Sequence, residues 1–104
     1  MLMTKQAWHS TTGSSGGLTA IELVEPPAYT VLYIDHSVTV ATNSVSLQSA
    51  QFSTGPWFIE TSTVTSSAVS TNFALRVTGP IGPWVRPYLH ATSTGTFDFL
   101  LVGV

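Results

Sequence analysis

The chain has 104 residues, and only three cationic and five acidic side chains give it a formal net charge of −2 at pH 7. Charged residues make up 8% of the chain, against roughly 25% in ordinary soluble domains, and a hydrophobic fraction of 43% is too high for a disordered chain. This length supports one domain and three cations cannot neutralise a row of phosphates, which excludes a multidomain enzyme and a nucleic-acid-binding protein with a basic face.

The first ten residues are predicted to form a short arm. Residues 12–17, with the sequence Thr-Gly-Ser-Ser-Gly-Gly, have the composition of a flexible linker. We therefore expect residues 1–17 to form a flexible N-terminal arm and Gly/Ser linker, and residues 18–104 to form the folded domain.

Strand signals dominate the rest of the chain. β-Branched and aromatic residues are abundant, and no long stretch has the i, i+3, i+4, i+7 apolar spacing of an amphipathic helix. Residues 29–35 are apolar on both faces, which is typical of a central strand covered on both sides. The predicted strands, in chain order, are residues 18–24, 29–35, 38–41, 45–52, 57–61 (with 63–65 as its continuation), 73–77, 84–91 and 96–102.

Turn residues separate these strands. Residues 53–56 (Ser-Thr-Gly-Pro) and 78–83 (Thr-Gly-Pro-Ile-Gly-Pro) are predicted turns. Pro87 lies inside a predicted strand, and because proline donates no ladder hydrogen bond, it indicates an edge strand or a bulge. About seven to nine short strands at this spacing predict an all-β fold, namely a single antiparallel, jelly-roll-like β-sandwich with a flexible N-terminal arm.

The residue types that carry catalysis or bind metals are scattered. His9, His36 and His90 are far apart in the sequence and no second ligand type clusters near them. The pair Asp35-His36 beside one of 13 serines is expected by chance, and there is no Gly-x-Ser-x-Gly elbow. Five isolated acids offer no carboxylate pair for glycoside hydrolysis, and the Gly-rich segment lacks the Lys-Ser/Thr of a phosphate-binding loop. We predict no enzymatic activity, no metal and no cofactor.

The chain has no cysteine, so a disulfide framework and a thiolate metal site are excluded. The first nine residues contain no apolar segment of the length that a secretory signal requires. The longest aliphatic or aromatic runs have about four residues, whereas a bilayer-spanning helix needs about 20. We expect synthesis in the cytoplasm and neither a membrane nor a nucleic acid as partner.

The scarcity of charge makes the surface informative. With 13 serines and 16 threonines, the exterior is expected to be rich in hydroxyl groups and to contain apolar patches. Permanent interfaces are depleted in charge in the same way, which favours packing against copies of the chain or a larger assembly. The candidate partner-binding residues are Trp8 and His9 in the arm, and Trp57 and Trp84, each of which follows a Gly-Pro turn.

The second half of the chain, residues 45–104, contains four short motifs in a characteristic order. Its motifs are Val-Ser-Leu-Gln-Ser-Ala (45–50), Gly-Pro-Trp-Phe-Ile (55–59), Gly-Pro-Trp-Val-Arg-Pro-Tyr-Leu (82–89) and Gly-Thr-Phe-Asp-Phe-Leu-Leu-Val-Gly-Val (95–104). This pattern resembles small β-sandwich structural proteins of tailed bacteriophages, which end in a Gly-Pro-aromatic strand, a Thr/Gly turn and a terminal strand. Two features depart from it: residues 53–57 replace an Asp-Gly-x-x-Trp sequence, and Pro87 interrupts the arginine strand.

The resemblance implies a virion structural protein, foremost a capsid decoration (cement) protein on the capsid surface, made in the host cytoplasm. Such a protein stabilises the shell by bridging subunits of the major capsid (coat) protein, often as a homotrimer. The alternative is a carbohydrate- or receptor-binding β-sandwich module of a tail fibre or a secreted protein. In that case Trp57 and Trp84 are candidates for stacking on sugar rings.

Overall fold

The computed structural model describes residues 4–10, 16–23, 27–37, 43–65, 71–89 and 96–104. These residues form nine β-strands, and among them there is no helix long and apolar enough to cross a membrane. The strands are β1 (Thr4–Ser10), β2 (Gly16–Gly17), β3 (Ile21–Glu22), β4 (Tyr29–Ser37), β5 (Asn43–Ala50), β6 (Phe58–Thr65), β7 (Thr71–Thr78), β8 (Trp84–Leu89) and β9 (Thr96–Gly103). The predicted all-β class is confirmed.

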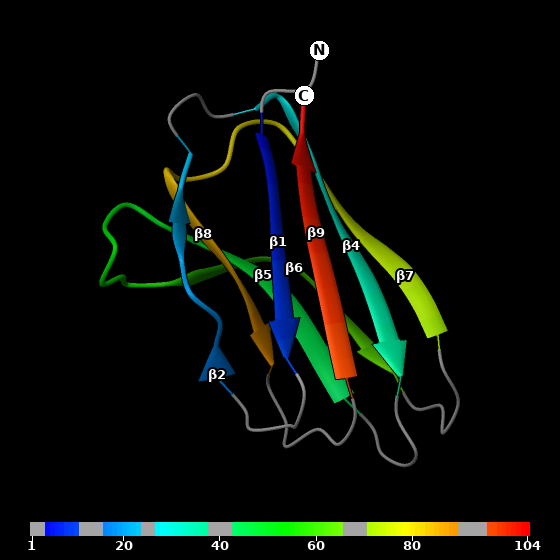
Figure 1. The fold of residues 1–104 in the computed structure, drawn as a ribbon. Helices are drawn as coiled ribbons and strands as arrows, with labels where there is room; N and C mark the ends of the chain where they lie inside the picture. Colours follow the sequence, from blue (N-terminus) through cyan, green and yellow to red (C-terminus); the bar gives the residue numbers. More distant parts are fainter. Residues whose placement is uncertain (1–3, 11–15, 24–26, 38–42, 66–70, 90–95) are drawn as a thin grey trace.

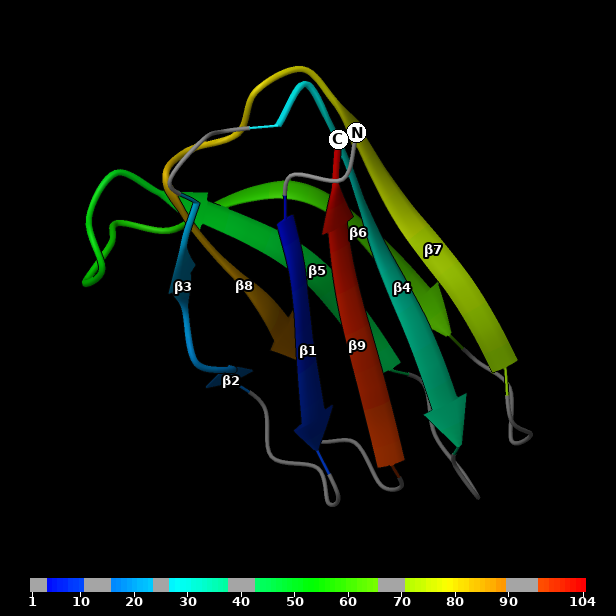
Figure 2. The same ribbon diagram turned by 45° about the horizontal axis from the view of Figure 1, so that its top comes forward.

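The strands form two sheets that pack face to face (Figure 1). Sheet A has the order β1-β9-β4-β7, and sheet B has the order β2-β8-β5-β6, with β3 also paired to β8. Every pairing among the described strands is antiparallel. The β5–β6 hairpin joins strands that are consecutive in the chain, and the other pairings join strands that are distant in it. Both views show the two layers side by side (Figure 2). This alternation of strands between two sheets is the jelly-roll arrangement, and it confirms the predicted antiparallel β-sandwich.

The core lies between the two sheets, and β9 shows most clearly how alternate residues of a strand enter it. On β9, Phe97, Phe99 and Leu101 are buried while Asp98 is exposed. The rings of Phe97 and Phe99 lie parallel, with their centroids 5.8 Å apart. Burial of each such side chain contributes about 1.5–3 kcal/mol. The other buried members of the core are Leu23, Leu32, Ile34, Val45, Leu47, Leu75, Ile81, Val85 and Leu89.

Residues 4–10 and 16–17 belong to this sandwich, which corrects the predicted boundary at residue 17. Thr4–Ser10 pairs along its whole length with β9, from Thr4 opposite Gly103 to Ser10 opposite Phe97. Gly16 and Gly17 pair with Leu89 and Tyr88. The sequence prediction failed here because β1 is polar: its main-chain groups complete the hydrogen-bond ladder of β9, and Trp8 alone supplies a large apolar contact with the core.

Two further predictions are corrected. The strand expected at residues 18–24 is reduced to β3, because the chain pairs only briefly with β8. β4 is a central strand as predicted, but it is not covered on both sides, since Tyr33 and Asp35 are exposed on its outer face. The strand predicted at residues 38–41 lies outside the described residues.

The structure contradicts the edge-strand interpretation of Pro87. β8 is not itself an edge strand, because it pairs with β5 on one side and with β2 and β3 on the other. The Pro87 carbonyl accepts from the Leu18 N–H at 3.0 Å, so the position that lacks an N–H faces the gap between β2 and β3. The missing donor therefore coincides with a break in the neighbouring strand.

The predicted turn at residues 53–56 is also found. The Gly55 N–H donates to the Phe52 carbonyl at 3.0 Å, and Gly55 has a φ of 89°. This positive φ favours glycine over residues with a Cβ. The turn returns the chain from β5 into β6.

Replacement of Trp8 by alanine tests whether β1 is part of the fold. Trp8 packs against the core and its Nε1–H donates to the Thr19 carbonyl at 2.7 Å, so we expect Trp8→Ala to lower the free energy of unfolding by about 3 kcal/mol. Lys5→Ala, at an exposed position of the same strand, should change it by less than about 0.5 kcal/mol. Urea unfolding measures both, and identical midpoints for the two variants would contradict the placement of β1.

Candidate functional site

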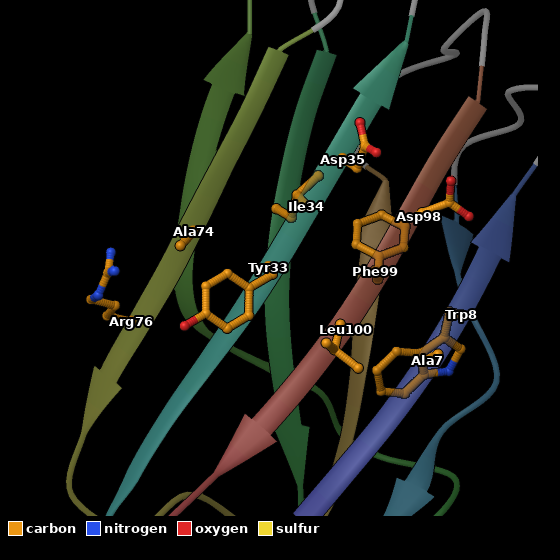
Figure 3. A pocket seen from close by; sticks show the side chains of 10 residues that line it. All are labelled: Ala7, Trp8, Tyr33, Ile34, Asp35, Ala74, Arg76, Asp98, Phe99 and Leu100. Atoms are coloured by element: carbon orange, nitrogen blue, oxygen red, sulfur yellow. The ribbon is translucent and has the colours of Figure 1, made fainter.

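A groove of about 760 Å³ lies on the outer face of sheet A, away from the core. Figure 3 shows that all four strands of the sheet contribute to it. The residues that line it are Ala7, Trp8, Tyr33, Ile34, Asp35, Ala74, Arg76, Asp98, Phe99 and Leu100. Because the strands are paired in register, the outward-facing members of this set fall into rows that cross the sheet.

The central row consists of Ala7, Leu100, Tyr33 and Ala74, which lie opposite one another on β1, β9, β4 and β7. The two alanines are too short to cover the Tyr33 ring, and 46% of Tyr33 is exposed. Figure 3 shows this ring lying over the sheet between Leu100 and Arg76. The centre of the groove is therefore apolar and presents one accessible aromatic ring.

One end of the groove is acidic. A second row of residues lies two positions, or about 7 Å, from the central row along the strands. In this row His9 is opposite Asp98, and Asp98 is opposite Asp35. His9 Nδ1 and Asp98 Oδ1 are 2.5 Å apart, and both side chains are more than half exposed. Solvent screens such an exposed pair, so it contributes little to the stability of the fold.

The opposite end of the groove carries Arg76. This residue lies two positions from Ala74 on β7, opposite Val31, and its side chain is exposed. In Figure 3 the Arg76 guanidinium lies at the outer edge of β7, and the Tyr33 hydroxyl points toward β7. The groove thus runs from a cationic end, across an apolar centre, to an acidic end.

Two of the four partner-binding candidates from the sequence lie at this groove. The Trp8 side chain packs against the core and donates to the Thr19 carbonyl, so Trp8 shapes the groove wall from within. His9 is exposed at the acidic end, where it holds Asp98.

The other two candidates, Trp57 and Trp84, belong to sheet B and its β5–β6 connection, so the structure does not bring the four together. The Arg86 guanidinium carbon lies 4.1 Å from the centre of the Trp57 ring and 5.3 Å from that of Tyr88. Its Nε–H donates to Gln48 Oε1 at 2.8 Å. Burial lowers the pKa of Arg86 and Tyr88 opposes this shift, and the guanidinium stays charged at neutral pH. Trp57 therefore contacts Arg86 within the protein, and both Trp57 and Trp84 are partly exposed.

The partner-binding residues predicted from the sequence do not include those that define the groove, namely Tyr33, Arg76, Asp35 and Asp98. A signal was available, because Tyr33 and Asp35 are two positions apart and must share one face of a strand. What the sequence does not contain is the register that aligns them with Asp98 and Ala74 on other strands.

The described residues contain no group of three His, Asp or Glu side chains that could hold a metal ion. The His36 side chain and His90 lie outside the described part of the structure.

Comparison with known proteins supplies the fold only. No family model and no curated protein matches the chain. Among similar solved structures, murine APRIL has a TM-score of 0.57 and 11% identity, and the match covers 97% of this chain and 100% of that one. The carbohydrate-binding module CBM4 has a TM-score of 0.55 and 17% identity, with 93% of this chain and 70% of that one covered. The tailspike protein 4 of bacteriophage CBA120 has a TM-score of 0.51 and 12% identity, with 95% of this chain and 19% of that one covered. At these identities the likeness shows a common sandwich architecture and leaves the ligand open.

The Arg86 cluster gives a prediction about sheet B. A Cβ added at Gly17 would lie 2.5 Å from the Arg86 guanidinium, so Gly17→Ala should displace this group from Trp57 and Gln48. We expect a loss of about 1–2 kcal/mol in the free energy of unfolding.

A double-mutant cycle provides the control. In an Arg86→Ala background the same Gly17→Ala change should cost nothing, because the guanidinium it displaces is absent. An equal cost in both backgrounds, measured by urea unfolding, would mean that Gly17 acts through its main chain alone.

Proposed function

We propose that this chain is a non-catalytic carbohydrate-binding module that holds a glycan in the groove on the outer face of sheet A. The observation that carries the proposal is the Tyr33 ring, partly exposed at the centre of an open groove with polar groups at both ends. A ligand would be retained by contact with this ring and by hydrogen bonds at the ends of the groove.

The chemistry of the groove matches that of a sugar. A pyranose ring has apolar C–H faces and a rim of hydroxyl groups, so it can lie on an aromatic ring while its rim bonds to polar side chains. The apolar row through Leu100 and Tyr33 offers the first kind of contact, and Asp35, Asp98 and Arg76 offer the second. Ala7 and Ala74 leave room beside the ring. Apolar concavities with a few convergent polar groups are the usual form of a small-molecule site.

The comparisons support this proposal at the level of architecture. A carbohydrate-binding module shares the fold over 93% of this chain, and jelly rolls are common among lectin domains. Because one fold serves many functions, the proposed sugar binding rests on the residues of the groove and not on the fold.

Removal of the Tyr33 ring is the direct test. We expect Tyr33→Ala to weaken glycan binding by about 10- to 100-fold, because the contact it makes with a sugar is apolar burial worth about 1.5–3 kcal/mol. Binding is first located on a glycan array and then measured by isothermal titration calorimetry. Phe52→Ala removes a more exposed ring outside the groove and should leave the affinity unchanged. Equal losses for both variants, or binding abolished by Trp57→Ala instead, would contradict the assignment.

A second candidate function is the capsid decoration role, with the coat protein as partner and a homotrimer as the assembled form. The specific observation in its favour is an apolar cluster around the β5–β6 hairpin, where Phe52, Phe58 and Ile59 are each more than half exposed. The segment between these strands projects beyond sheet B in Figure 1. The small number of charged residues, eight in the chain, and this projection both support a role in an assembly.

Mass measurement separates the two roles. Size-exclusion chromatography with light scattering at several concentrations should give a monomer of 11.1 kDa if the chain is a binding module that acts alone. A concentration-independent trimer that dissociates in a Phe52→Ser, Phe58→Ser, Ile59→Ser variant would instead favour the virion role.

A further inference from the structure

We infer that the groove selects sugars that carry a carboxylate, and that Arg76 binds this group. The inference deepens the proposed function and rests on it. Uronic acids and sialic acids share the required chemistry, a carboxylate on a sugar ring.

The first step is the state of Arg76. Its side chain is exposed, lines the groove, and forms no ion pair or hydrogen bond with any other residue that the structure describes. A guanidinium has five N–H donors arranged in a planar fork that matches the two oxygens of a carboxylate. Arg76 therefore offers the groove a cation whose hydrogen-bonding capacity is available to a ligand.

The second step is the distance between Arg76 and the aromatic ring. Tyr33 lies directly opposite Ala74, and Arg76 is two residues farther along β7. Diagonal neighbours of this kind are about 7–8 Å apart at their backbones, within reach of a long side chain. A sugar ring resting on Tyr33 can thus present a carboxylate to Arg76 without leaving the apolar centre.

The third step is the negative charge at the acidic end of the groove, opposite Arg76. Asp35 and Asp98 lie about 13 Å from the Arg76 row along the strands, and His9 is already paired with Asp98. Carboxylates at that end repel a carboxylate of the ligand. The two ends together fix the direction in which an acidic sugar enters, with its charged group toward β7.

The experiment uses matched ligand pairs. Calorimetric titration compares tetragalacturonate with its methyl ester, and sialyllactose with its methyl ester, so that each pair differs mainly in the charge of the carboxylate. We expect at least one acidic member to bind about tenfold more tightly than its uncharged partner. The acid that shows this preference identifies the source of the carboxylate, and the preference should shrink in high salt.

The variants assign the preference to Arg76. Arg76→Gln should reduce the ratio of acidic to uncharged affinity to about one, and Arg76→Lys should retain part of this ratio because the charge remains without the planar fork. Lys5→Gln makes the same change in net charge at the opposite edge of sheet A, outside the groove lining, and should have no effect. Circular dichroism verifies that each variant is folded.

Each outcome has one meaning. Equal affinity for acidic and uncharged ligands, with both lost in Tyr33→Ala, would overturn the inference and leave the proposed function standing. A preference for the acidic ligand that survives Arg76→Gln would also overturn it. An absence of binding to all four ligands and across the glycan array would overturn the inference and the proposed function together.

Discussion

The register of β9 is the constraint on which the rest of the structure depends. This strand lies between β1 and β4, and its alternation directs Phe97, Phe99 and Leu101 into the core and Asp98 and Leu100 to the outer face. A slip of one residue would exchange the two sets. It would place a carboxylate in the core and two phenylalanine rings on the surface, so the packing energy of the core also fixes the groove.

The groove is a consequence of this register. Tyr33 is accessible because the sheet aligns it with Ala7 and Ala74, whose side chains end at Cβ. Asp98 and Asp35 stand at one end and Arg76 at the other for the same reason. Of the eight charged side chains, four lie on or beside the outer face of sheet A, namely Lys5, Asp35, Arg76 and Asp98, and His9 lies beside them. This concentration of charge is the strongest departure from a uniform hydroxyl-rich surface.

Much of the fold was predictable from the sequence because alternation and turn chemistry are local. Val45 and Leu47 face the core as expected, Leu75 and Arg76 take opposite faces, and the Gly55-Pro56 turn lies where it was predicted. The place of β1 was not predictable in this way, since its role comes from main-chain pairing with a strand about 90 residues away. The site was missed for a related reason: its residues come from four strands, and only their register brings them together. Tryptophans drew attention in the sequence, yet the accessible ring of the groove is a tyrosine.

The most direct test of the account is an NMR titration of the ¹⁵N-labelled protein with neutral and acidic oligosaccharides. The account predicts that the amide signals of Ala7, Tyr33, Ala74 and Leu100, on four different strands, shift together and saturate at one ligand concentration. Shifts confined to the β5–β6 hairpin, or to sheet B around Trp57 and Arg86, would contradict the claim that the outer face of sheet A is the binding surface.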